Sequence, residues 1–443
     1  MTTLLKVDQT LLSEASDRLV YVRHYIGSGG QGEVYCVEWQ DRSVALKCYF
    51  PHQSTPEQRR AIQTLIRFGI PNSRFLWPIE LASSPDKPGF GYLMPLRDPQ
   101  YRSIVDLMKR RTEPSFYTLA TTGIELAHSF LQLHSKGLCY RDVSFGNVFF
   151  HPETGAVLIC DNDNVTVNGD MRSGVLGTPR FMAPEVVRRE AFPDTQTDLF
   201  SLSVLLFYLL MVHHPLEGKR ENEIKCLDLP AMNRLYGEEP LFIFDPADDR
   251  NAPVPGFHDN ALIFWPLYPK FLQRLFTRAF TEGLHKPGRR VRESEWRAAL
   301  GKLRDSLFHC QCGEENFFCL ETYRELSGSA RPCWACGKKL TPPMMLKVGR
   351  SQVMLDLNSK LYPHHLHGMG TYDFVEPIGE VSQNPRNPEQ WGLKNISGKD
   401  WIVETPEGEA RLIPSGRSFQ LNLGNRIDFG GVSGEIVSAG FML

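Results

Sequence analysis

The pattern of hydrophobic and polar positions changes twice along the chain. Up to about Asp305, short β-branched runs alternate with long amphipathic stretches, which predicts strands mixed with helices. From Met344 onward, short apolar runs are separated by Gly, Pro, Asn and Asp turns, which predicts an all-β region. The longest apolar stretch, Leu199–Val212, contains Ser201 and Ser203 and is shorter than the roughly 20 residues that span a bilayer. We therefore expect a buried helix there.

The composition is typical of a globular protein with little net charge. Of 443 residues, 42% are hydrophobic and 23% are charged, and the formal net charge is -2. This balance gives no overall basic surface, so we expect neither nucleic acid nor a membrane as a partner. The first residues include acids where a secretory signal would need basic residues. We expect a cytoplasmic protein.

A glycine-rich segment lies between two strand-like runs, LVYVRHYI and EVYCVEW. Residues 26–34 read I-G-S-G-G-Q-G-E-V, and glycines in such a loop let the backbone lie close to phosphates. A hairpin turn would look similar, but the strand after the glycines argues against a dinucleotide fold. Val44–Lys47 then reads V-A-L-K. A lysine in an apolar strand needs an anion such as the phosphates of ATP, unless it faces solvent.

A second group of polar residues follows a helical stretch, GIELAHSFLQLHSKG. Residues 140–150 read Y-R-D-V-S-F-G-N-V-F-F, so Asp142 and Asn147 lie five positions apart. Asp142 is suited to accept a substrate hydroxyl proton, and Asn147 to hold a magnesium ion. Asp161 follows the strand VLIC. Residues 177–185 read G-T-P-R-F-M-A-P-E.

In these segments the chain resembles the eukaryotic-type (Hanks-like) serine/threonine protein kinase superfamily. That family carries G-x-G-x-x-G-x-V, V-A-I-K, H-R-D-L-x-x-x-N, D-F-G and A-P-E motifs in this order. The resemblance implies an α+β, two-lobed kinase domain at residues 15–305, with an N-lobe at 15–95 and a C-lobe at 96–305. It implies ATP between the lobes, Mg²⁺ or Mn²⁺ as the metal, and a protein as the substrate.

The resemblance also assigns roles to individual residues. Lys47, Asp142, Asn147 and Asp161 are the expected catalytic residues, and the last two are the expected magnesium ligands. Asp198 is expected to bind the catalytic-loop backbone, and Arg290 to pair with Glu185. The expected ATP-binding residues are Gly27, Ser28, Gly29, Gly30, Gln31, Gly32, Val34, Ala45, Lys47, Met94 and Leu96.

Thr178 favours serine/threonine chemistry, because in that branch of the family this threonine contacts the catalytic aspartate. Three hydroxyl residues in or near the activation segment are candidate autophosphorylation sites, namely Thr166, Ser173 and Thr178.

The chain departs from the family pattern at four places. Tyr140 replaces the histidine of H-R-D and keeps an aromatic surface, and Ser144 replaces a lysine that contacts the γ-phosphate. Asn162 and Asp163 replace F-G; Asp163 binds metal or faces solvent, and we favour solvent. In the family, helix αC carries a glutamate that pairs with the lysine of the V-A-I-K strand. Here no such glutamate is evident, because Glu57 lies early for a partner of Lys47 and Gln63 or Thr64 is nearer the position of that glutamate. An ATP-binding pseudokinase scaffold is therefore the alternative to an active kinase.

Five of the ten cysteines lie between residues 310 and 336. C-Q-C-G and C-W-A-C-G have the texture of a zinc ribbon, in which turns direct four thiolates at one ion. The predicted module covers residues 308–340, with Cys310, Cys312, Cys333 and Cys336 as zinc ligands and His309 and Cys319 as substitutes. Reduced, unliganded thiols are the alternative. A disulfide pair is less favoured without a secretory signal.

The C-terminal region, residues 344–443, loosely resembles the forkhead-associated (FHA) fold. Its segment L-N-L-G-N-R-I-D-F-G matches the L-x-x-G-D-x-I-x-F-G ending of that family. The resemblance implies a β-sandwich in which Arg350, Ser359 and Asn395 contact a phosphothreonine-bearing partner. The alternative is a sandwich that packs on the zinc module or recruits another protein. The layout is similar to kinases of bacterial stress-signalling modules, so we expect a role in bacterial signalling.

Overall fold

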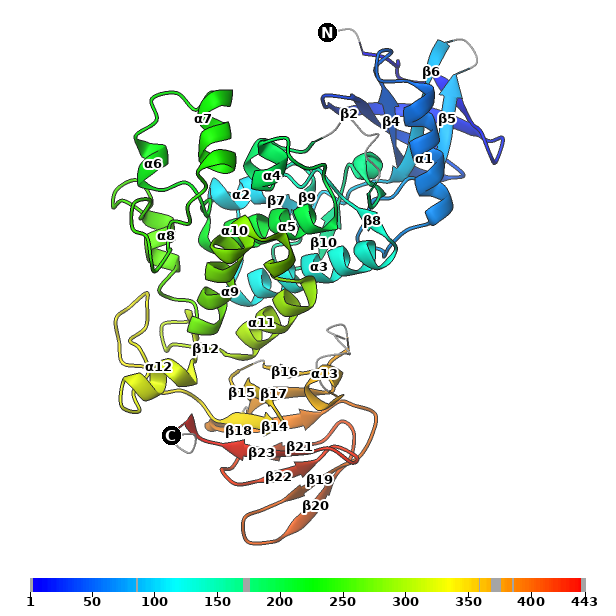
Figure 1. Cartoon of the computed structure of the whole chain (residues 1–443). Coiled ribbons are helices and arrows are strands. Elements are labelled where there is room, and N and C mark those ends of the chain that lie inside the picture. Colours follow the sequence, from blue (N-terminus) through cyan, green and yellow to red (C-terminus); the bar gives the residue numbers. More distant parts are fainter. Residues whose placement is uncertain are drawn as a thin grey trace. The chain divides into compact units, whose positions relative to one another are not determined.

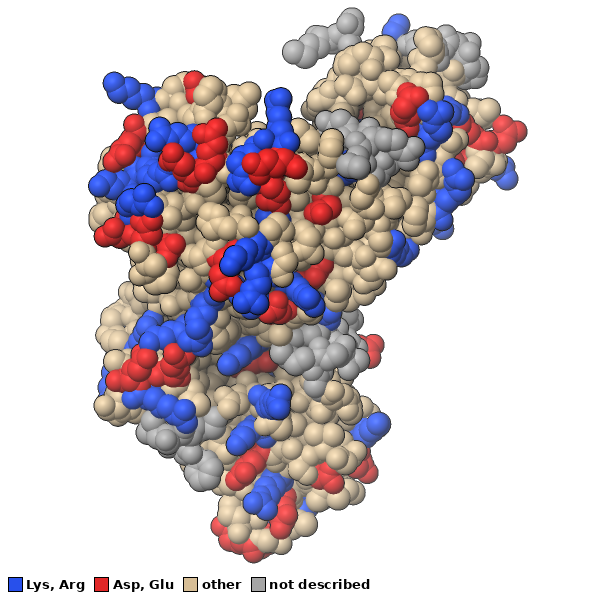
Figure 2. All heavy atoms as spheres, viewed as in Figure 1, with Lys and Arg blue, Asp and Glu red and all other residues tan. Residues whose placement is uncertain are grey.

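A computed structural model of the chain describes residues 3–84, 87–169, 176–357, 359–367, 376–384 and 386–439 (Figure 1). The chain forms two compact units. The first comprises residues up to Pro114, Thr122–Ala261 and Phe276–Ser294. The second comprises Ser115–Thr121, Leu262–Leu275 and the chain from Glu295 onward. Figure 2 shows a face on which basic and acidic side chains are interspersed, in line with the small net charge.

The first unit begins with a closed β-barrel of strand order β1-β2-β3-β4-β6-β5. Alternate residues point inward, and Val20, Val22, Val37 and Leu46 are fully buried. The strands are β1 (Thr10–Ser13), β2 (Leu19–Ser28), β3 (Gly32–Trp39), β4 (Arg42–Tyr49), β5 (Glu80–Ser84) and β6 (Lys87–Pro95). Because β1 pairs with both β2 and β5, the N-lobe begins before residue 15, the boundary that the sequence predicts.

Helix α1 (Pro56–Phe68) follows β4. Thr55 caps it by accepting a hydrogen bond from the backbone N–H of Gln58, and Pro56 occupies its first turn, where an N–H is not needed. Ile62 and Leu65 form its buried side. This is the only long helix before residue 100 among the described residues, so it takes the place of helix αC.

The rest of the first unit is mainly helical and is built around α5 (Thr195–Met211), which is buried from Thr197 to its end. The prediction of a buried apolar helix is therefore confirmed. Within the described ranges, every helix is too short or too polar to span a lipid bilayer. The elements between β6 and α5 are β7 (Arg102–Ser103), α2 (Ile104–Met108), α3 (Phe116–Ser135), β8 (Leu138–Cys139), β9 (Val148–Phe150), β10 (Val157–Ile159), η1 (Asn162–Asn164), β11 (Thr166–Val167), η2 (Pro179–Phe181) and α4 (Pro184–Val187).

After α5, short helices lead to the last helix before the cysteine-rich segment. They are α6 (Lys219–Asn222), α7 (Leu229–Asn233), η3 (Arg234–Glu238), α8 (Asp259–Phe264), α9 (Lys270–Phe280), α10 (Glu282–His285), η4 (Pro287–Arg289) and α11 (Glu293–Asp305). Two small antiparallel sheets, β10-β9-β7 and β11-β8, hold the loops that carry most of the candidate site.

In the second unit, the cysteine-rich segment packs against parts of the chain that the sequence assigns to the kinase domain. Its hairpin is β12 (Leu307–His309) and β13 (Glu315–Phe317), followed by α12 (Leu320–Glu325). Glu315 accepts hydrogen bonds from the backbone N–H groups of Phe116 and Tyr117, at the start of α3. The Phe116 ring lies 5.1 Å from Phe317 and 6.0 Å from Trp334. The predicted boundary near residue 308 is therefore not a break in packing.

The C-terminal region is a β-sandwich of two antiparallel sheets. One has the order β15-β14-β23-β22-β19-β20 and the other β16-β17-β18-β21. The buried residues between them include Leu346, Leu393, Trp401 and Ile427. The elements are β14 (Met345–Val348), β15 (Ser351–Met354), β16 (Lys360–Leu361), α13 (Pro363–His367), β17 (Gly379–Asn384), β18 (Asn387–Asn395), β19 (Trp401–Glu404), β20 (Ala410–Ile413), β21 (Ser418–Gln420), β22 (Arg426–Asp428) and β23 (Ser433–Val437).

Candidate active site

Lys47 lies in the central part of the barrel sheet and its ammonium group faces two carboxylates. Strand β4 pairs with β3 and β6, which puts Val34 opposite Lys47 and Ala45 opposite Met94. Lys47 is 5% exposed, and its Nζ contacts Asp161 and lies 2.8 Å from Oδ2 of Asp163. Burial alone would lower the pKa of Lys47, but the two carboxylates outweigh it and raise that pKa. The lysine therefore stays charged in the apolar strand.

The two carboxylates differ in exposure. Asp161 adopts the left-handed conformation (φ 53°) at the start of η1, and its side chain is 36% exposed. Asp163 is sealed from solvent and accepts a hydrogen bond from the hydroxyl of Tyr49 at 2.6 Å. Burial and the neighbouring Asp163 raise the pKa of Asp161 to about 6. Burial opposes ionisation of Asp163 as well, but Lys47 outweighs it and holds the pKa of Asp163 below its usual range.

The prediction that Asp163 faces solvent is therefore wrong. The side chain is fully buried because the strand that carries Lys47 lies directly over η1 and supplies hydrogen-bond donors to both of its oxygens. Asn162, the other replacement in this segment, is also buried and donates hydrogen bonds to the carbonyl oxygens of Leu76 and Ile159.

The loop after α3 and β8 brings Asp142 and Asn147 together. Asn147 Nδ2 donates to the carbonyl oxygen of Asp142 at 2.8 Å, which orients the amide. Thr178 Oγ1 donates to Asp142 Oδ1 at 2.9 Å. Gly177 has a φ of 109°, and a Cβ there would lie 2.8 Å from the carbonyl oxygen of Arg141, so glycine is needed for this close approach.

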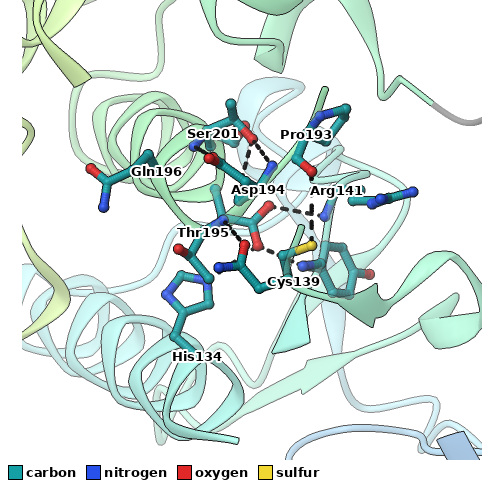
Figure 3. Close-up of polar contacts among 12 residues, drawn as sticks. His134, Cys139, Arg141, Pro193, Asp194, Thr195, Gln196 and Ser201 are labelled. Carbon is teal, nitrogen blue, oxygen red and sulfur yellow. Dashed lines mark hydrogen bonds and ion pairs between the residues drawn. The ribbon is translucent and has the colours of Figure 1, made fainter. Parts of the chain in front are cut away.

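Asp198 fixes the backbone of this loop, as predicted. Its carboxylate accepts hydrogen bonds from the backbone N–H groups of Tyr140 (2.5 Å) and Arg141 (2.9 Å). These bonds support Arg141 in the left-handed conformation at φ 70°, which a non-glycine residue adopts only with such support. Figure 3 shows residues around this loop, with His134 on α3, Arg141 on the loop itself and Asp194 at the start of α5.

The predicted pair of Glu185 and Arg290 is also present. The two terminal guanidinium nitrogens of Arg290, Nη1 and Nη2, donate to Glu185 at 2.8 Å, and the Arg290 side chain is 1% exposed. Tyr140 keeps the predicted aromatic packing, since its buried ring meets Phe130 edge-on at 5.8 Å.

The glycine-rich loop reaches the same site through Gln31. Its amide accepts a hydrogen bond from Lys47 Nζ at 3.2 Å and donates to Asn164 Oδ1 at 3.0 Å. A Cβ at Gly27, Gly29 or Gly30 would meet only open space, whereas one at Gly32 would lie 2.1 Å from a backbone oxygen of β4. Strand packing therefore requires glycine at Gly32, whereas no atom of the described residues fills the space beside Gly27, Gly29 and Gly30.

The remaining predicted ATP contacts lie around this loop and at the end of β6. Ser28 and Leu96 are exposed and Val34 is half-buried, while Ala45 and Met94 are buried. The sequence did not predict three side chains that form hydrogen bonds in the site, namely Asn164, Tyr49 and Gln58. The D-N-D-N run around residue 162 was a signal for Asn164, whereas no local pattern distinguishes Tyr49 or Gln58.

Comparison with known proteins decides the family. The sequence profile of the protein kinase domain matches residues 21–252, just over half of the chain. The chain belongs to the protein kinase family. The Hanks-like resemblance is thereby confirmed, together with the two-lobed fold.

Curated relatives agree with this assignment. Protein kinase YegI of Escherichia coli K12 is 25% identical over 302 residues, covering 64% of this chain and 45% of the relative. The DNA damage-responsive serine/threonine-protein kinase RqkA of Deinococcus radiodurans is 28% identical, over 45% of this chain and 30% of the relative. Serine/threonine-protein kinase plk-2 of Caenorhabditis elegans is 31% identical over 28% of this chain and 19% of the relative. The matched regions span less than half the length of these relatives.

Helix α1 of this kinase carries no acidic partner for Lys47. Glu57 is exposed and pairs with Arg60 on its own helix. Thr64 donates to the carbonyl oxygen of Arg60 on its own helix, whereas the hydrogen-bond partners of Lys47 Nζ are Gln31, Asp161 and Asp163. Gln58 of α1 instead bonds to the strand that carries Lys47, since its Nε2 donates to the hydroxyl of Tyr49 at 3.0 Å.

The candidate phosphorylation sites of the kinase differ in their surroundings. Thr166 lies in β11 opposite Cys139, and its Oγ1 is 3.6 Å from the cysteine sulfur. The hydroxyl of Thr178 donates a hydrogen bond to the carboxylate of Asp142. Ser173 lies outside the described residues. Modification of these residues stays a prediction.

The four predicted zinc ligands converge. Sγ of Cys310 lies 3.6 Å from Sγ of Cys336, and Sγ of Cys312 lies 3.7 Å from Sγ of Cys333. All four sulfurs lie within 4.8 Å of one another. Zinc–sulfur bonds of about 2.3 Å in a tetrahedron require sulfurs about 3.8 Å apart, so the set fits the ion.

The neighbourhood favours a thiolate at Cys333, while at Cys312 the backbone N–H of Glu314 is outweighed by the adjacent cysteines, which raise the pKa of Cys312. Burial opposes ionisation of Cys333, but the backbone N–H groups of Cys336 and Ala335 and the amide of Asn316 outweigh it and lower the pKa of Cys333 to about 6. His309 is engaged elsewhere, with its Nδ1 2.7 Å from a carboxylate oxygen of Asp356. Cys319 lies outside the four-sulfur cluster.

The three predicted phosphopeptide contacts do not have equal access. Arg350 is exposed in the turn between β14 and β15, and Ser359 accepts a hydrogen bond from the backbone N–H of Asp356. Asn395 is 0% exposed; its Nδ2 donates to the carbonyl oxygens of Lys399 and Ile413, and its Oδ1 accepts from Ser397. Asn395 therefore orders its own loop. Phosphothreonine binding stays a prediction.

Proposed function

We propose that the chain transfers the γ-phosphoryl group of ATP to serine or threonine hydroxyls of proteins, itself included. The observation that carries the proposal is the hydrogen bond from Thr178 Oγ1 to Asp142 Oδ1 at 2.9 Å. It leaves the aspartate oriented to receive the proton of an alcohol. A role in cytoplasmic signalling is part of this proposal and is supported by the similarity to a DNA damage-responsive bacterial kinase.

Each residue has a distinct task in this reaction. Asp142 accepts the proton of the attacking hydroxyl, and Thr178 and Asp198 fix the loop that carries it. Lys47 neutralises phosphate oxygens, since it is a charged ammonium group held by the buried carboxylate of Asp163 and by that of Asp161. The open glycines of residues 27–30 give the phosphates room.

Asn147 and Asp161 would hold Mg²⁺ or Mn²⁺. Both offer oxygen atoms, which these ions prefer, and Asp161 is the more exposed of the two carboxylates beside Lys47. When bound, the metal neutralises charge that develops on the transferred group. The protein's part is to fix the ligands, which it does through η1 and through the bond from Asn147 to the Asp142 backbone.

The test is incorporation of label from γ-labelled ATP with Mg²⁺. Wild-type protein should label serine or threonine on itself or on a generic protein substrate. Asp142→Asn and Lys47→Met should reduce labelling by about 10²-fold or more. ATP binding without any labelling would overturn the proposal in favour of the pseudokinase scaffold.

We also propose a structural zinc ion at Cys310, Cys312, Cys333 and Cys336, supported by the sulfur spacing. With four thiolate ligands the site would be closed and would stabilise the fold instead of catalysing a reaction. For the C-terminal region we propose an FHA-like sandwich. This is supported by its two sheets and by the burial of Leu421, Ile427 and Phe429, the apolar residues of the ending motif.

A further inference from the structure

A charged lysine in a buried strand needs a carboxylate that holds it in place. Lys47 has two candidates, Asp161 and Asp163, within contact of Nζ. In related kinases this carboxylate belongs to a glutamate of helix αC. Here the helix in that place, α1, has Glu57 as its single acid, and the side chain of Glu57 is 73% exposed and paired with Arg60. The counterion of Lys47 therefore comes from another element.

Asp163 has the geometry of that counterion. Its Oδ1 accepts from Lys47 Nζ at 3.0 Å, and its Oδ2 lies 2.8 Å from the same nitrogen. Oδ2 also accepts from the hydroxyl of Tyr49 at 2.6 Å. The Asp163 side chain is 0% exposed, whereas that of Asp161 is 36% exposed. Both oxygens of Asp163 are thus committed to β4, and Asp161 is left as the carboxylate open to a cation.

Neutral side chains connect α1 to the ion pair of Lys47 and Asp163. Gln58 Nε2 donates to Tyr49, and Tyr49 in turn donates to Asp163. The helix therefore touches the ion pair through a glutamine and a tyrosine, without supplying charge.

We propose that Asp163 is the positioning residue for Lys47 in this kinase, in the role that a glutamate of helix αC has in its relatives. The inference rests on the proposed nucleotide site. The segment after β10 then carries both carboxylates of the site, one for the lysine and one for the metal. Lys47 is held without any acid on α1, so the missing glutamate does not make the chain a pseudokinase.

Nucleotide affinity of the full-length protein tests the proposal, measured with fluorescent mant-ADP both in Mg²⁺ and in EDTA. Asp163→Asn keeps the shape and removes the charge, and it should weaken affinity about tenfold or more under both conditions. Asp163→Glu should recover part of the loss, and Glu57→Gln should change nothing. In a double-mutant cycle, Asp163→Asn should add little to Lys47→Met, because both remove the same pair.

The outcomes separate this proposal from its rivals. A loss of affinity in Mg²⁺ alone would make Asp163 a metal ligand and overturn the proposal, as would unchanged affinity in Asp163→Asn. If Asp163→Asn does not fold, Tyr49→Phe, which removes one donor to Asp163, should still weaken affinity in EDTA; no effect would overturn the proposal. Wild-type protein that binds mant-ADP with this dependence but transfers no phosphate would defeat the proposed function alone.

Discussion

His134 of α3 lies between two acids, with its Nε2 3.1 Å from Asp198 Oδ2 and its Nδ1 in contact with Glu293. The same Asp198 carboxylate accepts hydrogen bonds from the backbone of Tyr140 and Arg141. His134 is thus connected through Asp198 to the backbone of the loop that carries Asp142. Burial would lower the pKa of His134, but its bonds to Asp198 and Glu293 outweigh burial and raise the pKa to about 9.

The stability of the first unit should therefore fall on the alkaline side. An unfolded histidine titrates near pH 6.5, so the contribution of His134 is fully present below that pH and is lost as pH rises through about 9. The expected decrease in unfolding free energy between pH 6.5 and 9.5 is about 2–3 kcal/mol. Urea unfolding at a series of pH values measures it.

His134→Gln should be less stable than wild type at pH 6.5 and should lose this pH dependence. His24→Gln, at an exposed position of β2, is the matched control and should keep the wild-type profile. A profile of His134→Gln that parallels wild type would show that another group is responsible.

Arg290 should be a large contributor to stability. Arg290→Ala leaves the carboxylate of Glu185, which is only 14% exposed, without its bidentate partner, and this is expected to lower the unfolding free energy by about 3 kcal/mol. Arg290→Lys should recover only part, because lysine lacks the planar fork. Arg60→Ala, which breaks an exposed pair with Glu57, should cost less than about 1 kcal/mol in the same denaturation experiment.

Thr178 should affect turnover more than ATP affinity. Thr178→Val removes the hydrogen bond to Asp142, so the general base loses its fixed orientation and kcat should fall about 10- to 100-fold. Thr178→Ser keeps the hydroxyl and should stay close to wild type. Steady-state phosphorylation kinetics with varied ATP separate the two parameters. A change confined to the KM for ATP would contradict the proposed contact with the base.

The cysteine cluster should contain one zinc ion per chain, which elemental analysis of purified protein measures. Cys333→Ser should lose the metal and destabilise the second unit, because the ion links the β12–β13 hairpin to the turn at residues 333–336. Cys319→Ser, outside the cluster, should retain it. If metal-free protein is as stable as the purified wild type, the four residues are reduced cysteines that bind no metal.

Sequence motifs predicted much of the active site because kinase chemistry requires fixed residue types at fixed spacings. Asp142 and Asn147 lie in one short loop, so their five-residue spacing suffices to bring them together. The apolar run of α5 likewise predicts burial by itself. The convergence of Cys310, Cys312, Cys333 and Cys336 follows from two tight cysteine turns.

Contacts between distant segments could not be read in this way. Asp163 looked like a solvent-facing acid because its neighbours in the sequence say nothing about Lys47 and Tyr49, more than 110 positions away. Asn395 looked like an open amide, but its partners lie across the loop at Lys399 and Ile413.

The sequence alone thus determined the family, the order of the motifs and the candidate zinc ligands, because each rests on residue type and local spacing. Only the tertiary structure decided that Asp161 and Asp163 both contact Lys47, that Gln58 of α1 bonds to Tyr49, and that Glu315 accepts hydrogen bonds at the start of α3. The physical reason is the same in each case. A buried polar group is satisfied by whichever partner packing brings within hydrogen-bond distance, and packing depends on the whole chain.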